Sequence, residues 1–159
     1  MKTSDDKLRQ ILEESRQNYI ESQKSQENLL EDYYQVHKVR FAYLLKKMND
    51  MLEEKPKTKI LDIGIYPPFL ALALQKLGCE IEGISSPTED CKYPGLKTRQ
   101  LNVEVEKLPY KSNSFDIVIF TEILEHFYRS PKLILKEIKR VLKPGGGFDF
   151  NHSKRDQTF

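Results

Sequence analysis

Cysteine is scarce in this chain of 159 residues, which contains only Cys79 and Cys91. Two cysteines are too few for a disulfide framework, and they lack the clustered cysteine and histidine spacing of a zinc site. We therefore expect a reducing, cytoplasmic setting and no bound metal.

Long apolar runs and an excess of charge of one sign are also missing. The longest apolar run, residues 69–74, is far shorter than the roughly 20 residues that a membrane-spanning helix needs. The amino terminus has no apolar signal core, and the formal net charge is only +2. These absences predict a soluble intracellular protein that binds neither a membrane nor nucleic acid.

Glycine and proline are absent from residues 3–54, where helix formers dominate, so we expect helices throughout this arm. The polar stretch at residues 21–28 indicates a break. The second helix has apolar residues at three- and four-residue spacing, a pattern that predicts docking on the domain that follows. These are Leu30, Tyr33, Tyr34, His37, Phe41, Leu44, Leu45, Met48 and Leu52. A group on this helix that includes His37 and Arg40 either packs in the core or closes over a pocket.

Residues 59–78 read as a buried strand, a tight turn and a helix. The apolar run at residues 60–63 is typical of a central parallel strand. Gly64 allows the backbone to turn, and Pro67 with Pro68 suits the first turn of a helix. A helix that begins at the end of a central strand often faces a ligand crevice, although an ordinary connection without a ligand has the same pattern.

The rest of the chain alternates strands and helices. We expect strands at residues 79–84, 98–102, 115–120 and 148–150, a helical turn from Thr121, and a helix that Ser130 caps with Pro131 in its first turn. This alternation predicts an α/β fold with a doubly wound, mostly parallel sheet in strand order 3-2-1-4-5. Gly64 and Thr121 then face each other at the switch point. We expect a helical arm or cap at 1–55 and a Rossmann-like domain at 56–159.

Three blocks of this sequence resemble the class I S-adenosylmethionine-dependent methyltransferases, in particular the small-molecule group called type 11. They are ILDIGIYPPFLALALQKLGCEIEGI, LPYKSNSFDIVIFTEILEHF and LILKEIKRVLKPGGGF. The resemblance covers roughly residues 59–150 and implies S-adenosyl-L-methionine as the cofactor, bound across the ends of the first, second and fourth strands. By position, Asp62 orients the glycine turn, and Gly64 with Ile65 brings backbone close to the methionine part.

The resemblance also assigns the nucleoside part. Asn102 reads the adenine amino group, with a backbone contact from Val103, and Thr121 and Glu122 border the cofactor. Ser85 stands where the family has an acid that binds both ribose hydroxyls.

Three departures from the family pattern leave alternatives open. Glu89 or Asp90 can replace the acid missing at Ser85 only if their loop permits. Tyr66 and Pro68 stand where the family prefers glycine, so the Tyr66 side chain either points away from the cofactor site or fills it. The chain also ends shortly after the fifth strand, without the usual terminal strand pair, which leaves a sheet edge exposed.

The leading hypothesis is therefore methyl transfer to an unidentified small-molecule acceptor. No dedicated base is required, and the catalytic residues stay unassigned, although His37 and His126 are candidates. A catalytically inactive binding or assembly module is the alternative. A nicotinamide-dependent oxidoreductase is disfavoured because its fingerprint needs three glycines after the first strand. A homodimer would form through the exposed sheet edge or the N-terminal helices.

Overall fold

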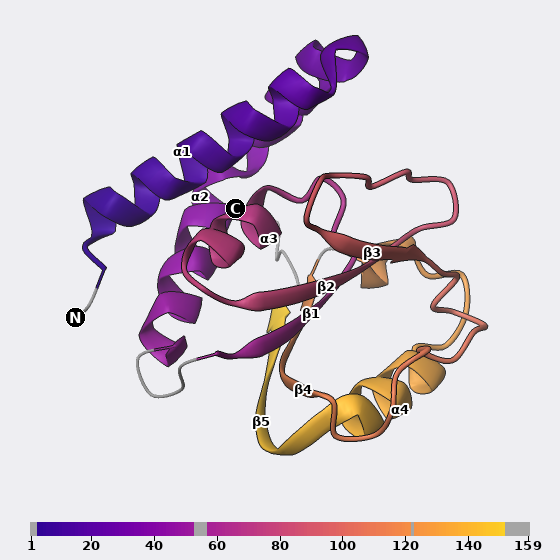
Figure 1. Ribbon diagram of the computed structural model, residues 1–159. Helices are drawn as coiled ribbons and strands as arrows, with labels where there is room; N and C mark the ends of the chain where they lie inside the picture. The colour runs from indigo at the N-terminus through magenta and orange to yellow at the C-terminus, as the bar shows by residue number, and fades with distance from the viewer. Residues whose placement is uncertain (1–2, 53–56, 122, 152–159) are drawn as a thin grey trace, which may run out of the picture. The chain divides into compact units, whose positions relative to one another are not determined.

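The structure, a computed structural model, describes residues 3–52, 57–121 and 123–151 (Figure 1). The chain divides into two compact units that alternate along the sequence. The helical unit contains Met1–Thr58, Tyr66–Ile81 and Cys91–Leu96. The sheet unit contains Lys59–Ile65, Glu82–Asp90 and Lys97–Phe159. The division into an arm at 1–55 and a domain at 56–159 stays a prediction.

The helical unit opens with α1 (Asp5–Ser22), the 3-10 turn η1 (Lys24–Gln26) and α2 (Glu27–Leu52). Ser4 caps α1 by accepting a hydrogen bond from the Lys7 amide, which satisfies one of the donors that a helix start leaves free. The break at η1 lies in the polar stretch where the sequence predicted one, so the prediction of two helices is confirmed.

Phe69, the first residue of α3 (Phe69–Lys76), is the aromatic centre of the helical unit. Its ring meets Tyr19 of α1 and both Tyr34 and Phe41 of α2 edge to face, with centroids 5.8, 5.4 and 5.9 Å away. Aromatic pairs favour this geometry because the positive ring edge meets the negative face. The three helices therefore share one core.

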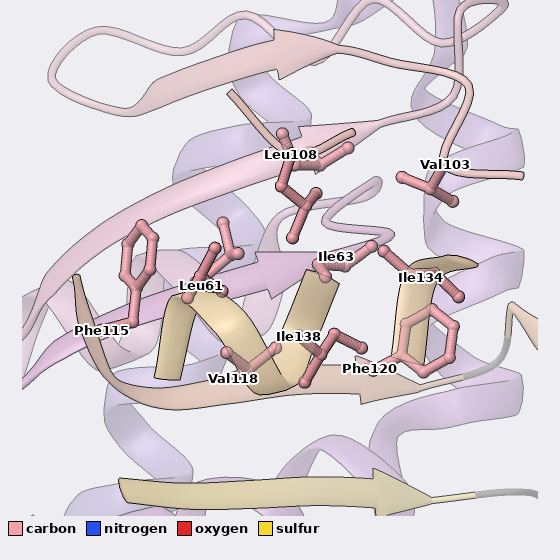
Figure 2. Packing of buried hydrophobic residues seen from close by; sticks show 11 residues of the cluster. Leu61, Ile63, Val103, Leu108, Phe115, Val118, Phe120, Ile134 and Ile138 are labelled. Atoms are coloured by element: carbon pink, nitrogen blue, oxygen red, sulfur yellow. The ribbon is translucent and has the colours of Figure 1, made fainter. Parts of the chain in front are cut away.

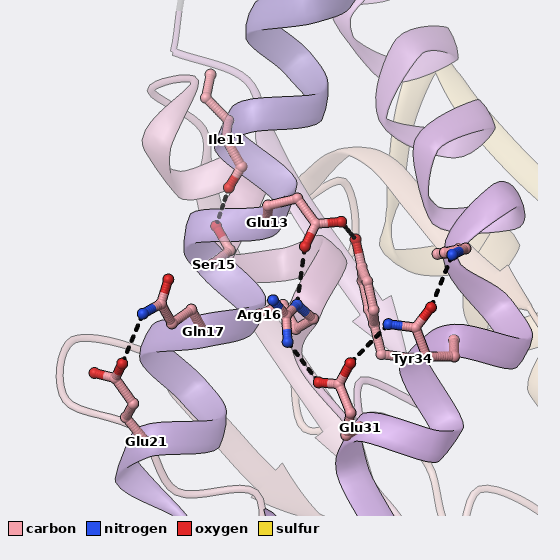
Figure 3. A network of polar contacts seen from close by, with 10 residues as sticks. Ile11, Glu13, Ser15, Arg16, Gln17, Glu21, Glu31 and Tyr34 are labelled. Atoms are coloured by element: carbon pink, nitrogen blue, oxygen red, sulfur yellow. Dashed lines mark hydrogen bonds and ion pairs between the residues drawn. The ribbon is translucent and has the colours of Figure 1, made fainter.

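Polar contacts also join α1 to α2 (Figure 3). The Arg16 guanidinium donates to Glu13 on its own helix and to Glu31 on α2, and the Tyr34 hydroxyl donates to Glu13 over 2.7 Å. Burial raises the pKa of Tyr34, so this hydroxyl stays protonated and remains a donor.

The start of α3 corrects one prediction. Pro67 and Pro68 do not form the first turn: the Tyr66–Pro67 peptide bond is cis, and Pro68 is the residue before the helix. The helix ends at Lys76, and Gly78 follows with φ +91°, a conformation that glycine adopts more readily than other residues.

The sheet has the predicted order, β3-β2-β1-β4-β5. The strands are β1 (Lys59–Ile63), β2 (Glu80–Ser85), β3 (Lys97–Gln100), β4 (Phe115–Thr121) and β5 (Leu142–Asn151). The pairs β1–β4, β2–β3 and β4–β5 are parallel, and Ile63 lies opposite Phe120. The carboxyl ends of β1 and β4 are therefore neighbours at one edge of the sheet.

Three element boundaries in the sheet unit differ from the sequence prediction. Thr121 belongs to β4, and the following helical turn is only η2 (Leu124–His126). Helix α4 (Lys132–Val141) begins after Pro131, so Ser130 is not its cap. The glycine run does not separate α4 from β5: the strand begins at Leu142, and a register shift opposite Phe115 and Ile117 takes up the irregularity.

One apolar cluster fills the sheet unit (Figure 2). Residues of β1 and β4 meet one face of α4, where Ile134, Ile138 and Val141 are buried. Val103 and Leu108, from the connection between β3 and β4, join the same cluster. This packing holds that connection against the sheet and so positions the loop that contains Asn102.

Candidate functional site

Asp62 lies in β1, two residues before Gly64, and is only 6% exposed. Within the described part of the chain, no donor contacts its carboxyl group. Burial alone raises its pKa to about 7. An unpaired buried carboxyl that titrates near neutrality costs stability, and such groups concentrate at functional sites.

The turn after β1 is held by the backbone of β2. The amides of Gly64 and Ile65 both donate to the Ile84 carbonyl, over 2.8 and 3.1 Å. Gly64 has φ +86°, and a Cβ placed there would lie 2.4 Å from Ile123 Cδ1 and 3.7 Å from the Thr121 carbonyl. Gly64 and Thr121 therefore face each other as predicted, and the Ile123 side chain lies directly against the glycine.

Ser85 is buried at the end of β2, but its hydroxyl donates to the Glu89 carbonyl over 3.1 Å. The loop folds back so that Glu89 Oε2 accepts the Ser86 amide over 3.2 Å. Gln100 of β3 fixes the same loop, since its side-chain amide donates to the Glu89 carbonyl over 2.9 Å. The loop thus brings a carboxylate to the strand end where Ser85 supplies none.

Asn102 follows β3 and shapes the next loop through its own side chain. Its Oδ1 accepts the Glu104 amide over 3.1 Å, and its backbone amide donates to Glu106 over 2.8 Å. This local turn holds the Asn102 side chain at the surface, while the neighbouring Val103 side chain is buried in the core.

Glu104 joins two loops of the sheet unit. Its Oε2 accepts the consecutive amides of Tyr128 and Arg129, over 3.0 and 2.7 Å. The connection after β3 is thereby attached to the residues that follow η2. The turn η2 itself begins directly after Ile123. Hydrogen bonds to a charged acceptor are stronger than neutral ones, so this contact restrains the segment.

We expect Glu104→Ala to release that segment. Losing two charge-assisted acceptor contacts at a partly exposed position should lower the free energy of unfolding by about 1–2 kcal/mol. Hydrogen exchange should accelerate at the Tyr128 and Arg129 amides, by about tenfold or more. Glu125→Gln, a change at a neighbouring exposed carboxylate, is the control and should leave both amides protected. Unchanged exchange in Glu104→Ala would contradict the assignment.

Tyr66 belongs to the helical unit, where its hydroxyl donates to the Gln26 side chain over 2.7 Å. Glu122 lies outside the described residues. His126 is exposed, and His37 packs between the rings of Tyr33 and Phe41.

Sequence reasoning missed two residues of this region, Ile123 and Glu104. A single isoleucine or glutamate after a strand carries no distinctive pattern. Only the fold brings Ile123 against Gly64 and Glu104 against the amides of Tyr128 and Arg129.

The described residues contain no group of three or more histidine, cysteine, aspartate or glutamate side chains that could hold a metal ion. No helix within them has the length and apolar character to span a membrane.

A family model described as "Methyltransferase domain" matches residues 61–150, which runs from β1 to β5. This chain belongs to the methyltransferase domain family. The match covers every position that the sequence assigned to the cofactor site, although the roles of the individual residues stay predictions.

Curated methyltransferases align with most of this chain. The ubiquinone biosynthesis O-methyltransferase of Rickettsia canadensis is 28% identical over an alignment of 119 positions, which covers 70% of this chain and 49% of that protein. The sterol 24-C-methyltransferase of Gibberella zeae is 27% identical, over 92% of this chain and 45% of that protein. The chain thus spans about half the length of the curated relatives it matches.

Solved structures agree on the methyltransferase fold. A Pyrococcus horikoshii protein superposes with a TM-score of 0.55 at 21% identity, covering 77% of this chain and 66% of that one. A Methanococcus maripaludis protein gives a TM-score of 0.56 at 18% identity, covering 77% of this chain and 62% of that one. At these identities the likeness shows the fold alone.

Proposed function

We propose that this chain is the catalytic domain of an S-adenosyl-L-methionine-dependent methyltransferase that acts on a small molecule. The observation that carries the proposal is the buried carboxyl of Asp62 at the switch point of a methyltransferase sheet. Switch points of open α/β sheets are where ligands bind, and a buried acid there that no described donor contacts fits a cationic ligand.

The described residues fit this cofactor in their chemistry. S-adenosylmethionine carries positive charge on its amino group and its sulfonium, which suits Asp62. Its ribose hydroxyls need acceptors, and Glu89 offers one: Oε1 of this carboxylate has no donor within the described residues. We therefore assign to Glu89 the part that Ser85 cannot supply.

The apolar and backbone groups have separate tasks. Gly64, Ile65 and Thr121 form the floor at the ends of β1 and β4. The Ile123 side chain covers Gly64. When a ligand displaces this side chain, Ile123 would line the site with an apolar surface that excludes water. We assign Asn102 and Val103 to the adenine side, as the resemblance implies.

When bound, the cofactor supplies an electrophilic methyl group attached to sulfur. The chain's own contribution is to hold the acceptor in line with that group, because orientation provides most of the acceleration in such transfers. We assign no general base: His126 is exposed, and His37 packs among the aromatic rings of Tyr33 and Phe41 in the helical unit.

The acceptor is proposed only as a small molecule. One relative is named for O-methylation and another for C-methylation, so the acceptor atom does not follow from the likeness. A cytoplasmic location and a homodimer also stay predictions.

Calorimetric titration of the chain with S-adenosylhomocysteine tests the proposal. We expect saturable binding, and Glu89→Gln should weaken it by about tenfold because a neutral amide is a poorer acceptor than a carboxylate. Glu125→Gln is the matched exposed control. The absence of both binding heat and a thermal shift at about 1 mM ligand would contradict the enzyme proposal.

One observation favours the alternative of an inactive binding module. The Gly64 and Ile65 amides are already bonded to Ile84, and Ile123 lies where a ligand would approach Gly64. Ile123→Ala separates the two functions. An enzyme with a displaceable Ile123 binds S-adenosylhomocysteine in both forms, whereas an inactive module binds in neither form or only after the substitution.

A further inference from the structure

Helix α2 has a second apolar stripe, on the side that does not pack in the core. Leu29, Val36, Val39 and Tyr43 are exposed by 67%, 76%, 77% and 60%. The buried residues of α2, which include Leu30, Phe41, Leu44 and Met48, lie on the opposite side. A surface helix normally has charged and polar residues where this second stripe runs, so the stripe indicates an interface.

The spacing of the stripe is that of a helix-pairing seam. Leu29, Val36 and Tyr43 recur every two turns, and Val39 lies between the last two. Apolar residues at alternating three- and four-residue steps are what a second helix packs against in a coiled coil. The partner that fits is therefore another helix.

The distribution of charge along α2 indicates which helix is the partner and in which direction it runs. At 100° per residue, Asp32 is the charged residue beside the stripe in the amino-terminal part, whereas Arg40, Lys46 and Lys47 flank the stripe after Val36. Glu31 is directed to α1 instead, where it accepts from Arg16. A second α2 in antiparallel orientation brings each acidic part against a basic part. A parallel copy would bring like charges together.

We propose that two copies of this chain associate through α2, antiparallel, about a two-fold axis between Val36 and Val39. In such an isologous contact Val36 meets Val39 of the other copy, and Asp32 lies near Lys46 of the other copy. Lys46 already bonds Asp5 of its own chain over 2.5 Å at the surface, and in the dimer it lies between two carboxylates.

The size of the contact sets the expected strength. From Leu29 to Lys47 the helix runs about 27 Å at 1.5 Å per residue, so one pair of helix faces buries less than the roughly 800 Å² per partner of a standard interface. We expect a reversible dimer with a dissociation constant in the micromolar range, weakened by salt.

Sedimentation equilibrium over a dilution series of the full chain is the first test. We expect a mass that rises from 18.7 kDa toward twice that value with concentration. Val36→Glu combined with Val39→Glu should raise the dissociation constant by about a hundredfold, since like charges then meet at the axis. Leu135→Glu, at an exposed leucine of α4, is the control and should leave it unchanged. Circular dichroism checks that each variant is folded.

Cysteine cross-linking then tests the direction of the pairing. Val39→Cys should form a disulfide between copies because it lies near the axis, whereas Leu29→Cys should not, because its equivalents lie at opposite ends of the seam. Equal cross-linking at both positions would indicate a parallel pair and overturn the proposal. A chain that is monomeric at all concentrations, or a dimer that survives the paired glutamate substitutions, would overturn it as well.

Discussion

Asp62→Asn is expected to make the protein more stable at pH 8 and less able to bind cofactor. At that pH the buried Asp62 carboxyl is ionised without a described donor, which costs free energy. An asparagine has nearly the same shape and no charge. We expect the free energy of unfolding to rise by about 1–3 kcal/mol, less than the full ionisation cost because the new amide also needs partners.

The pH dependence identifies the cause of this effect. The folded-state pKa of Asp62 is raised to about 7 from 3.8, so below about pH 4 both the folded and unfolded states hold the proton. Between these values the unfolded chain releases the proton and the folded chain keeps it, so stability falls as pH rises toward 7. Asp62→Asn should lose this slope. Denaturant unfolding from pH 4 to pH 8 measures it, with Glu125→Gln as the exposed control.

The affinity for the cofactor should change with pH in the opposite direction to the stability. If Asp62 faces the positive groups of S-adenosylmethionine, ionisation favours binding, and the affinity of the wild-type chain should rise as pH increases through 7. Asp62→Asn should bind about tenfold or more weakly at pH 8 and show no such rise. A variant that gains stability yet binds as the wild type does would show that Asp62 is a buried acid outside the ligand site.

Glu137→Ala should strongly destabilise the sheet unit. Glu137 is only 3% exposed, and its Oε2 accepts the Leu108 amide over 3.0 Å and the Arg140 guanidinium over 2.6 Å. Arg140 in turn donates to the carbonyls of Leu108 and Tyr110. The pair attaches α4 to the connection between β3 and β4. We expect a loss of about 2–4 kcal/mol in the free energy of unfolding.

One further variant and a measurement at low pH separate charge from packing. Glu137→Gln keeps an acceptor for the Leu108 amide and should lose about half as much stability. The Arg140 guanidinium holds the pKa of the Glu137 carboxyl below its usual value, so its contribution is present at neutral pH and disappears as pH falls through the lowered pKa. Denaturant unfolding near pH 3 should therefore bring wild type and Glu137→Ala closer together. An equal difference at pH 3 and pH 7 would contradict the ion pair as the cause.

The order of the strands could be predicted because patterns within short segments of the sequence indicate it. The apolar runs at residues 60–63 and 115–120 are long enough to identify β1 and β4, and the alternation with helices then leaves few parallel topologies. Helix-forming residues without glycine or proline predicted α1 and α2, and the polar stretch at residues 21–28 predicted the break at η1. Element boundaries next to glycine and proline were less predictable: the prolines before Phe69 and the glycine run at residues 145–147 were assigned by their commonest roles, and neighbouring elements overrode both.

What the sequence determined by itself is therefore the strand order, which depends on patterns within short segments, and the family, which three motif blocks of the sequence indicate by resemblance. The tertiary structure decided which groups meet. It placed Ile123 against Gly64, brought Glu89 to the end of β2, and paired Glu137 with the Leu108 amide across 29 positions of the chain. Such contacts depend on how distant loops are held by the sheet and α4, and no local pattern encodes that distance.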